Sequence, residues 1–176
     1  MLIFIKLPRG GIWTLSPSDD QKPKQLIGAQ AGNDNLSRDG RWLAYQSSES
    51  GGRNEVYVQP FPLTGAKYQI STSGGGDPLW SPDGKQLFYL TPGGRQIVSV
   101  DIQTQPSFAF GKATPLPIEG IISTGPRSYD ITPDGKYFVV MLPKAQTDRD
   151  KAPPGQINIT LTLNWFEELK QRVPVR

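Results

Sequence analysis

Short apolar segments separated by tight turns make up most of the chain. The segment Gln86–Leu90 is apolar at nearly every position, which is typical of a strand covered on both faces. It follows Ser-Pro-Asp-Gly at residues 81–84, where proline presets φ, aspartate can bond its own backbone and glycine can take a positive φ. This pattern predicts two antiparallel strands joined by a type I turn with a glycine bulge.

The same turn followed by an apolar strand occurs three times. Besides the copy that begins at Ser81, it is found at Ser37–Tyr45 and at Thr132–Val140. The copies start about 44 and about 51 residues apart, which is close to the length of a propeller blade. The sequence therefore predicts an all-β protein, a β-propeller with about four blades in the chain.

The repeat divides the chain into four blades. We assign them to residues 1–28, 29–73, 74–119 and 120–164, and expect a short C-terminal helix or tail at 165–176. The segment 143–156 has no apolar period and predicts a loop, and Asn164 with Glu167 predicts the helix cap. The expected strands are Leu2–Lys6, Ile12–Leu15 and Gln25–Ile27; Asn33–Ser37, Trp42–Gln46, Glu55–Gln59 and Lys67–Ser71; Pro78–Trp80, Gln86–Leu90, Gln96–Asp101 and a looser strand near Ala113–Pro117; and Ser128–Ile131, Tyr137–Leu142 and Ile157–Leu163.

Four blades leave the closure of the ring open. The chain could close as a small ring, or it could be a half-propeller completed by a second copy. We expect the first blade to lack its innermost strand and the last blade to lack one strand, which leaves unpaired edges at both ends. Two chains could abut their end blades in a symmetric ring, so we expect a homodimer.

Composition excludes several classes of chemistry. The 176 residues include no cysteine and no histidine, which removes disulfides, cysteine nucleophiles, the Ser-His-Asp triad and zinc sites built on these residues. No cofactor is expected, and a hard cation such as calcium, held by oxygens, is left open. The net charge is +3 without runs of like charge, so a nucleic-acid partner is not expected. No segment reaches the roughly 18 apolar residues of a membrane span.

At the repeated turns the chain resembles the TolB-like, WD-repeat-like β-propellers, whose signature is Ser-Pro-Asp-Gly-Lys before an apolar strand. Asp39–Tyr45 with Arg53–Pro62 is similar to the propeller that follows the kinase domain in some bacterial membrane serine/threonine kinases, and Ile159–Trp165 fits the end of such propellers. The resemblance implies a bacterial, extracytoplasmic or periplasmic protein, although Met1–Ile5 lacks the basic leader and the length of a signal peptide. It also leaves open that the chain is a segment of a longer protein.

Polar residues at the start of the innermost strands form the candidate binding site. By the repeat register Asn33, Asp77 and Ser128 are equivalent and should point towards one axis, where Asp77 could pair with Arg127. Polar groups that converge on a pocket favour ligand binding; the alternative is that they satisfy strand ends and hold water. The expected ligand-binding residues are Asn33, Asp77, Arg127, Tyr129, Arg53 and Glu49. Arg53 and Arg95 could bind a carboxylate or pair with local acids.

The sequence favours a non-catalytic propeller for protein interaction or small-ligand sensing, with no catalytic residue assigned. One alternative is a carbohydrate-active enzyme, glycosidase or lyase-like, in which Asp77 works with Glu49 or Glu55. Another is a sensor fragment of a bacterial receptor kinase. The turn residues Asp39, Asp83 and Asp134 either complete the turns or bind calcium, and turn chemistry favours the first interpretation.

Overall fold

The computed structural model describes residues 2–5, 10–16, 22–94, 96–122, 127–142 and 160–162. These residues form strands and turns, and their single helical segment is the short η1 (Pro92–Gly94). Within these ranges no helix has the length and apolar character needed to cross a membrane. The predicted loop at 143–156, the predicted helix after Asn164, and Arg95 lie outside the described residues.

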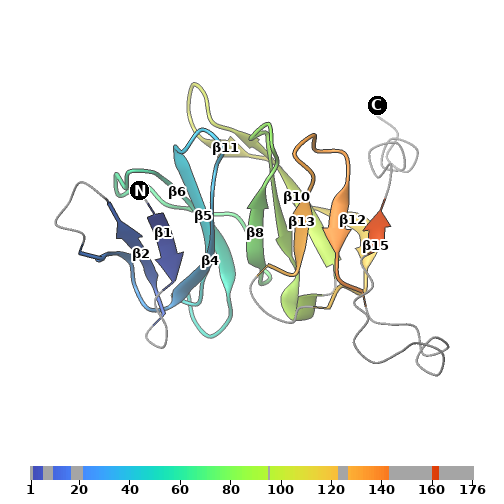
Figure 1. Ribbon diagram of the computed structural model, residues 1–176, viewed down its shortest axis with the longest axis horizontal. Coiled ribbons are helices and arrows are strands. Elements are labelled where there is room, and N and C mark those ends of the chain that lie inside the picture. Colours follow the sequence, from blue (N-terminus) through green and yellow to red (C-terminus); the bar gives the residue numbers. More distant parts are fainter. Residues whose placement is uncertain are drawn as a thin grey trace.

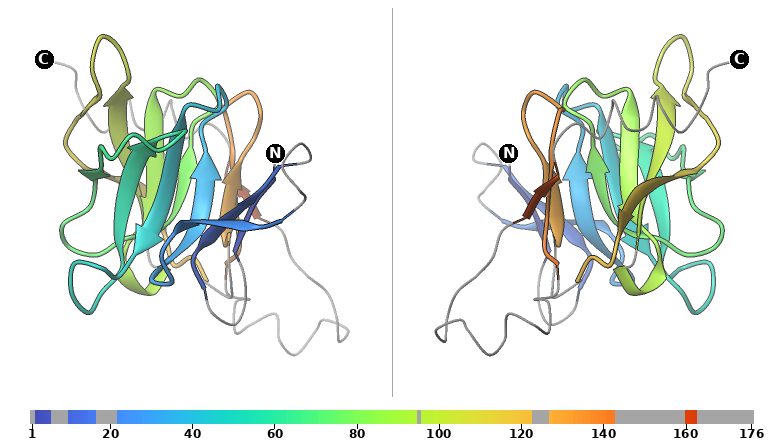
Figure 2. Two further views of the ribbon diagram at one scale, coloured as in Figure 1. Left: turned by 90° about the vertical axis from the view of Figure 1, so that its left-hand side faces the viewer. Right: turned by 90° about the vertical axis from the view of Figure 1, so that its right-hand side faces the viewer.

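The strands form four antiparallel sheets arranged side by side, which confirms the prediction of an all-β chain of blades (Figures 1 and 2). We refer to the sheets as blades 1 to 4 in chain order. Blade 1 contains β1 (Leu2–Ile5), β2 (Ile12–Leu15) and β3 (Lys24–Ile27); blade 2 contains β4 (Ala31–Leu36), β5 (Trp42–Ser47), β6 (Glu55–Pro60) and β7 (Tyr68–Gln69); blade 3 contains β8 (Gly76–Trp80), β9 (Gln86–Leu90), β10 (Gln96–Gln103), β11 (Ala109–Phe110) and β12 (Thr114–Glu119); blade 4 contains β13 (Tyr129–Ile131), β14 (Phe138–Val140) and β15 (Thr160–Thr162).

Blade 3 is more elaborate than the sequence predicts. Its third strand, β10, is 8 residues long and extends beyond β9. The far end of β10 pairs with the two-residue strand β11, through Ile102 opposite Phe110, while its first half pairs with β12. The single loose strand expected near Ala113–Pro117 is therefore one of two outer strands.

Each repeated turn is held by the same side-chain contacts. The carboxylate of Asp39 accepts a hydrogen bond from Ser37 Oγ at 2.6 Å, and Ser37 Oγ accepts one from the Trp42 N–H at 2.9 Å. Gly40 closes the turn at φ 71°, a value that glycine adopts without a steric penalty. The network recurs at Ser81–Gln86 and Thr132–Tyr137. The three aspartates therefore act in the turns, which supports the turn interpretation over the calcium one.

Apolar clusters fill the space between successive blades. Phe88 of blade 3 meets Phe138 of blade 4 edge-on, with ring centroids 4.9 Å apart, and both are fully buried. The opposite face of β9 presents Leu87 and Tyr89 to the cluster shared with blade 2. Burial on both faces explains why β9 is apolar at consecutive positions. Complete burial of a side chain such as Phe88 stabilises the fold by about 1.5–3 kcal/mol.

The outer face of blade 1 is also apolar. In the antiparallel pairing of β1 and β2, Leu2 lies opposite Leu15 and Phe4 lies opposite Trp13, so these four side chains share one face. The other face carries Ile12, which is buried against blade 2. Leu2 is 56% exposed, and none of the four belongs to a described core cluster. Blade 1 thus has the two apolar faces of an internal blade.

Candidate functional site

Two β-bulges shape the inner strands of blades 2 and 3. The register shifts between Gly32 and Asn35 in β4, and between Gly76 and Leu79 in β8. Within them Asn33 has φ 47° and Asp77 has φ 50°. Asparagine and aspartate are the residues other than glycine that tolerate this left-handed region best. Bulges of this kind redirect side chains next to binding sites.

Asp77 is tied to three neighbouring residues. Its carboxylate accepts a hydrogen bond from the Asn33 side-chain amide, and its N–H donates to Gln46 Oε1 at 3.1 Å. Its carbonyl oxygen accepts a hydrogen bond from the Tyr129 hydroxyl at 2.8 Å. Burial raises the pKa of the Asp77 carboxyl, and the hydrogen bond from Asn33 offsets part of that rise. These contacts join the inner strands of blades 2, 3 and 4.

Arg127 takes the place that the repeat register gave to Ser128. Ser128 is only 1% exposed and is not among the residues that line the pocket. Arg127 has φ 65°, and the left-handed conformation thus falls one residue earlier in blade 4. Its guanidinium lies 4.0 Å from the Asp130 carboxylate, while the Asp77 carboxylate accepts from Asn33. The suggested Asp77–Arg127 pair is therefore not among the ion pairs of the described residues.

A pocket of about 130 Å³, which we call the mouth pocket, lies where the inner strands of the blades meet. Four expected site residues line it, together with residues that sequence reasoning did not assign to the site. Its lining is Ile5, Asn33, Asp34, Asp77, Pro78, Leu79, Arg127 and Tyr129. The chain therefore brings together one residue from blade 1 and several from each of the other blades.

Asp34 is the acidic residue that the predicted site omitted. Burial raises the pKa of its carboxyl, while its own backbone N–H and the positive charge of Arg127 oppose the rise. In a regular strand Asp34 would face away from its neighbour Asn33, but both line the mouth pocket. The bulge accounts for this, because two residues of the bulged strand oppose one on the partner.

A second pocket of about 350 Å³ adjoins the first and shares Asn33 and Asp77 with it. Arg53 lines this second pocket, beside the loop that contains Pro92 and Gly93. Arg53 is therefore close to the site but outside the mouth pocket itself. Glu49 lines neither pocket; its carboxylate pairs with Lys67 Nζ at 2.8 Å.

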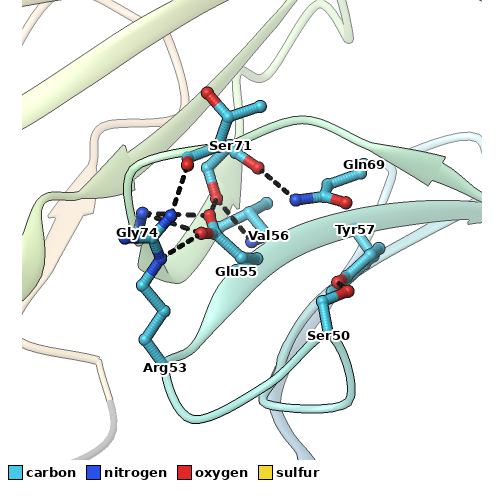
Figure 3. Close-up of polar contacts among 9 residues, drawn as sticks. Ser50, Arg53, Glu55, Val56, Tyr57, Gln69, Ser71 and Gly74 are labelled. Atoms are coloured by element: carbon cyan, nitrogen blue, oxygen red, sulfur yellow. Dashed lines mark hydrogen bonds and ion pairs between the residues drawn. The ribbon is translucent and has the colours of Figure 1, made fainter.

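Glu55 is a buried structural carboxylate (Figure 3). It is 3% exposed and accepts hydrogen bonds from the Gly74 N–H at 2.9 and 3.0 Å and from the Ser71 hydroxyl. Arg53 Nε donates to it at 2.8 Å, and Arg53 Nη2 donates to the carbonyl of Thr72 at 2.6 Å. These bonds attach the segment after β7 to the start of β6. Glu55 lines neither the mouth pocket nor the second pocket.

The carboxylates that share the mouth pocket are therefore Asp34 and Asp77, whereas the enzyme alternative had paired Asp77 with Glu49 or Glu55. Tyr129 is buried, and burial followed by the charge of Asp77 raises the pKa of its hydroxyl, which remains a proton donor. In the part of the chain that the structure describes, no three Asp or Glu residues gather as a metal site would require. The mouth pocket thus offers two carboxylates, one amide and one guanidinium beside an apolar wall.

No family model and no curated protein matches the sequence. Among solved structures, TolB from Acinetobacter baumannii is 18% identical over 92% of this chain and 38% of its own, with a TM-score of 0.64. A protein described as TolB from Agrobacterium tumefaciens is 22% identical over 92% of this chain and 54% of its own, with a TM-score of 0.65. The chain thus spans about half or less of these proteins. At such identities the likeness concerns the fold, and it confirms the resemblance drawn from the repeated turns: the chain has the fold of a TolB-like β-propeller, present here as four blades of a partial ring.

Proposed function

We propose that the chain is a non-catalytic propeller module that binds a small ligand or a partner protein at the mouth pocket. The observation that carries this proposal is the convergence of Asn33, Asp77, Arg127 and Tyr129 on one pocket at the inner strands. Small-ligand sites are concave and largely apolar, with a few convergent polar groups, as this pocket is.

The backbone of Arg127 supports the proposal. A left-handed conformation costs an L-residue with an ordinary side chain roughly 1–2 kcal/mol, and glycine would avoid that cost. Non-glycine residues held in this region cluster at binding sites and persist where the surroundings fix them. Asparagine and aspartate tolerate a positive φ, so the residue type alone explains this conformation at Asn33 and Asp77. Arginine does not tolerate it in the same way, so the conformation of Arg127 needs another reason. A role for the guanidinium gives a reason for arginine at this position.

The positions of Glu49 and Glu55 do not support the enzyme alternative in which one of them works with Asp77. Glu55 is saturated by buried hydrogen bonds, and Glu49 is paired with Lys67. Neither faces Asp77 across a pocket, as a glycosidase pair would. A sensor role within a receptor kinase is one form of the same binding proposal, and it rests on the sequence likeness of Arg53–Pro62.

The apolar outer face of blade 1 supports a second element, association into a homodimer. In blade 4 the outward face carries Val139, which is half-buried, and the neighbouring Met141 is 39% exposed. Each successive pair of blades already packs through apolar faces, so an end-to-end contact between blade 1 and blade 4 of a second copy would continue the same packing.

A thermal-shift screen tests the binding proposal. The chain would be melted with a library of small metabolites and short peptides, alongside Asp77→Asn and Arg127→Asn, two substitutions compatible with a positive φ. A ligand present at about 100 times its Kd stabilises the fold by about 2.7 kcal/mol, or about 5 °C or more in Tm. We expect hits on the native chain that both variants lose. The variant Lys85→Gln, in the turn that joins the far end of β8 to β9, should retain them. Hits that survive in both variants would contradict the site.

A further inference from the structure

We infer that the mouth pocket takes a small zwitterion, an α-amino acid with a short apolar side chain. The inference rests on the proposed function, because it names the ligand class of the same pocket. It follows from three features of the lining: acids on one side, a guanidinium in the same cavity, and an apolar wall.

The acids provide a site for an ammonium group. Asp34 and Asp77 both line the pocket, and each is partly buried. Oδ1 of Asp77 accepts the Asn33 amide, and no described residue donates a hydrogen bond to its Oδ2. The Asp34 side chain accepts no hydrogen bond from any other described side chain. Two partly buried carboxylates, which among the described side chains accept only the Asn33 amide, favour a cationic group, because burying a charge is costly unless it is paired.

Arg127 makes a purely cationic ligand a poor match. Its guanidinium lines the same pocket, and its charge acts on Asp34. The ion pair with Asp130 is long, at 4.0 Å, and both side chains are more than half exposed, so Arg127 is available to a ligand. A guanidinium binds a carboxylate through two parallel hydrogen bonds. A ligand that carries an ammonium and a carboxylate close together satisfies both sides of the pocket.

The size of the pocket limits the rest of the ligand. A volume of about 130 Å³ is close to the roughly 150 Å³ of an engineered apolar cavity that holds benzene. Ile5, Pro78 and Leu79 provide the apolar wall. The pocket is open on one side, so the apolar side chain of leucine or valine can lie against this wall while its charged groups stay at the mouth. The hydroxyl of Tyr129 is already bonded to the carbonyl of Asp77, so it shapes the pocket without being required by the ligand.

Isothermal titration with three matched probes tests the inference. L-leucine carries both charges, 3-methylbutylamine lacks the carboxylate, and 4-methylpentanoate lacks the ammonium. We expect L-leucine to bind at least tenfold more tightly than either analogue. Asp77→Asn and Asp34→Asn should weaken L-leucine and the amine alike. Arg127→Asn should weaken L-leucine at least tenfold and should not weaken the amine, which loses a like charge in the pocket, and Lys85→Gln should change neither.

Two results would overturn the inference. If the amine binds as tightly as L-leucine and Arg127→Asn has no effect, the pocket takes a cation and the zwitterion is wrong. If none of the three probes binds, the amino-acid class is wrong. The proposed function fails separately, when the broader thermal-shift library also gives no hit that depends on Asp77 and Arg127. A hit of another class in that library would retain the binding site and reject only the zwitterion.

Discussion

Asn33 and Asp77, 44 residues apart in the chain, are joined by a hydrogen bond from the amide of the first to the carboxylate of the second. Each lies in a bulge at a positive φ, 47° and 50°, on the inner strand of its own blade. The bond therefore links two blades at the same level of the propeller and fixes one wall of the mouth pocket. The contacts of Asp77 therefore predict how substitutions at this position should change stability.

Substitutions of Asp77 should separate backbone conformation from charge. Asp77→Asn keeps an acceptor oxygen and tolerates the positive φ, so its free energy of unfolding should stay within about 0.5 kcal/mol of the native value. Asp77→Ala removes the bond to Asn33 and puts a residue that tolerates the left-handed region less well than aspartate at this position, so it should cost about 2–3 kcal/mol. Asp77→Gly should recover the conformational part of this loss. Urea unfolding measures all three, and equal losses for alanine and glycine would reject the conformational explanation.

Glu55 should matter for stability more than any other carboxylate described. Glu55→Gln replaces a buried acceptor of bonds from Gly74, Ser71 and Arg53 with a neutral amide, which should cost about 1.5–3 kcal/mol. Glu49→Gln is the matched control, because its pair with Lys67 is partly exposed and should contribute less than about 1 kcal/mol. Denaturant unfolding of both variants gives the comparison. Similar losses in the two variants would count against the buried network.

The two acids of the mouth pocket should give stability an unusual pH dependence. Burial raises the pKa of Asp34 and Asp77 above the ordinary value of 3.8, so the native state binds more protons than the unfolded chain between the ordinary and the raised values. The native protein therefore loses stability from this pair as pH rises through that window. The double variant Asp34→Asn/Asp77→Asn has no carboxyl group at either position, so it does not lose stability in this way. The free energy of unfolding of the variant minus that of the native chain should therefore be larger at neutral pH than below pH 3.8. Unfolding curves at both pH values test this, and an unchanged difference would refute it.

The apolar outer face of blade 1 predicts association. Light scattering at micromolar concentration should give a mass of two 19.4 kDa chains. Phe4→Lys or Val139→Lys places a charge in the proposed contact and should return the mass to that of one chain. Thr14→Lys is not a suitable control, because Thr14 faces blade 2. Lys85→Gln is the control, because Lys85 is exposed in the turn between β8 and β9 of blade 3. A sharp monomeric mass for the native chain, with a cooperative melt, would contradict the dimer.

The sequence predicts the blades well because the turns carry strong local signals. Ser81, Asp83 and Gly84 form the turn their chemistry favours, and the apolar run after them is buried on both faces. Register between the repeats also predicts that Asn33 and Asp77 lie together. The first inference depends on residues that are close in sequence, and the second depends on strict repetition between the blades.

Other features of the site depend on departures from repetition. A bulge adds a residue to one strand, so alternation misplaces Asp34. In blade 4 the residue with the positive φ is Arg127, one position earlier than the repeat register predicts. The role of Glu55 depends on where the backbone of Gly74 turns, 19 residues further along, and no local pattern reports that contact. The sequence signal that could have indicated Asp34 is its position directly after Asn33, at the start of an inner strand.

Crystallographic soaking with a library of small fragments tests the binding site most directly. We expect bound fragments to collect in the mouth pocket, with polar groups against Asp34, Asp77 and Arg127. The same soak on Asp77→Asn/Arg127→Asn should leave that pocket empty. Fragments that gather instead at the opposite face, in the groove of about 390 Å³ that contains Pro82 and Pro133, with the mouth pocket empty in the native chain, would contradict the proposed site.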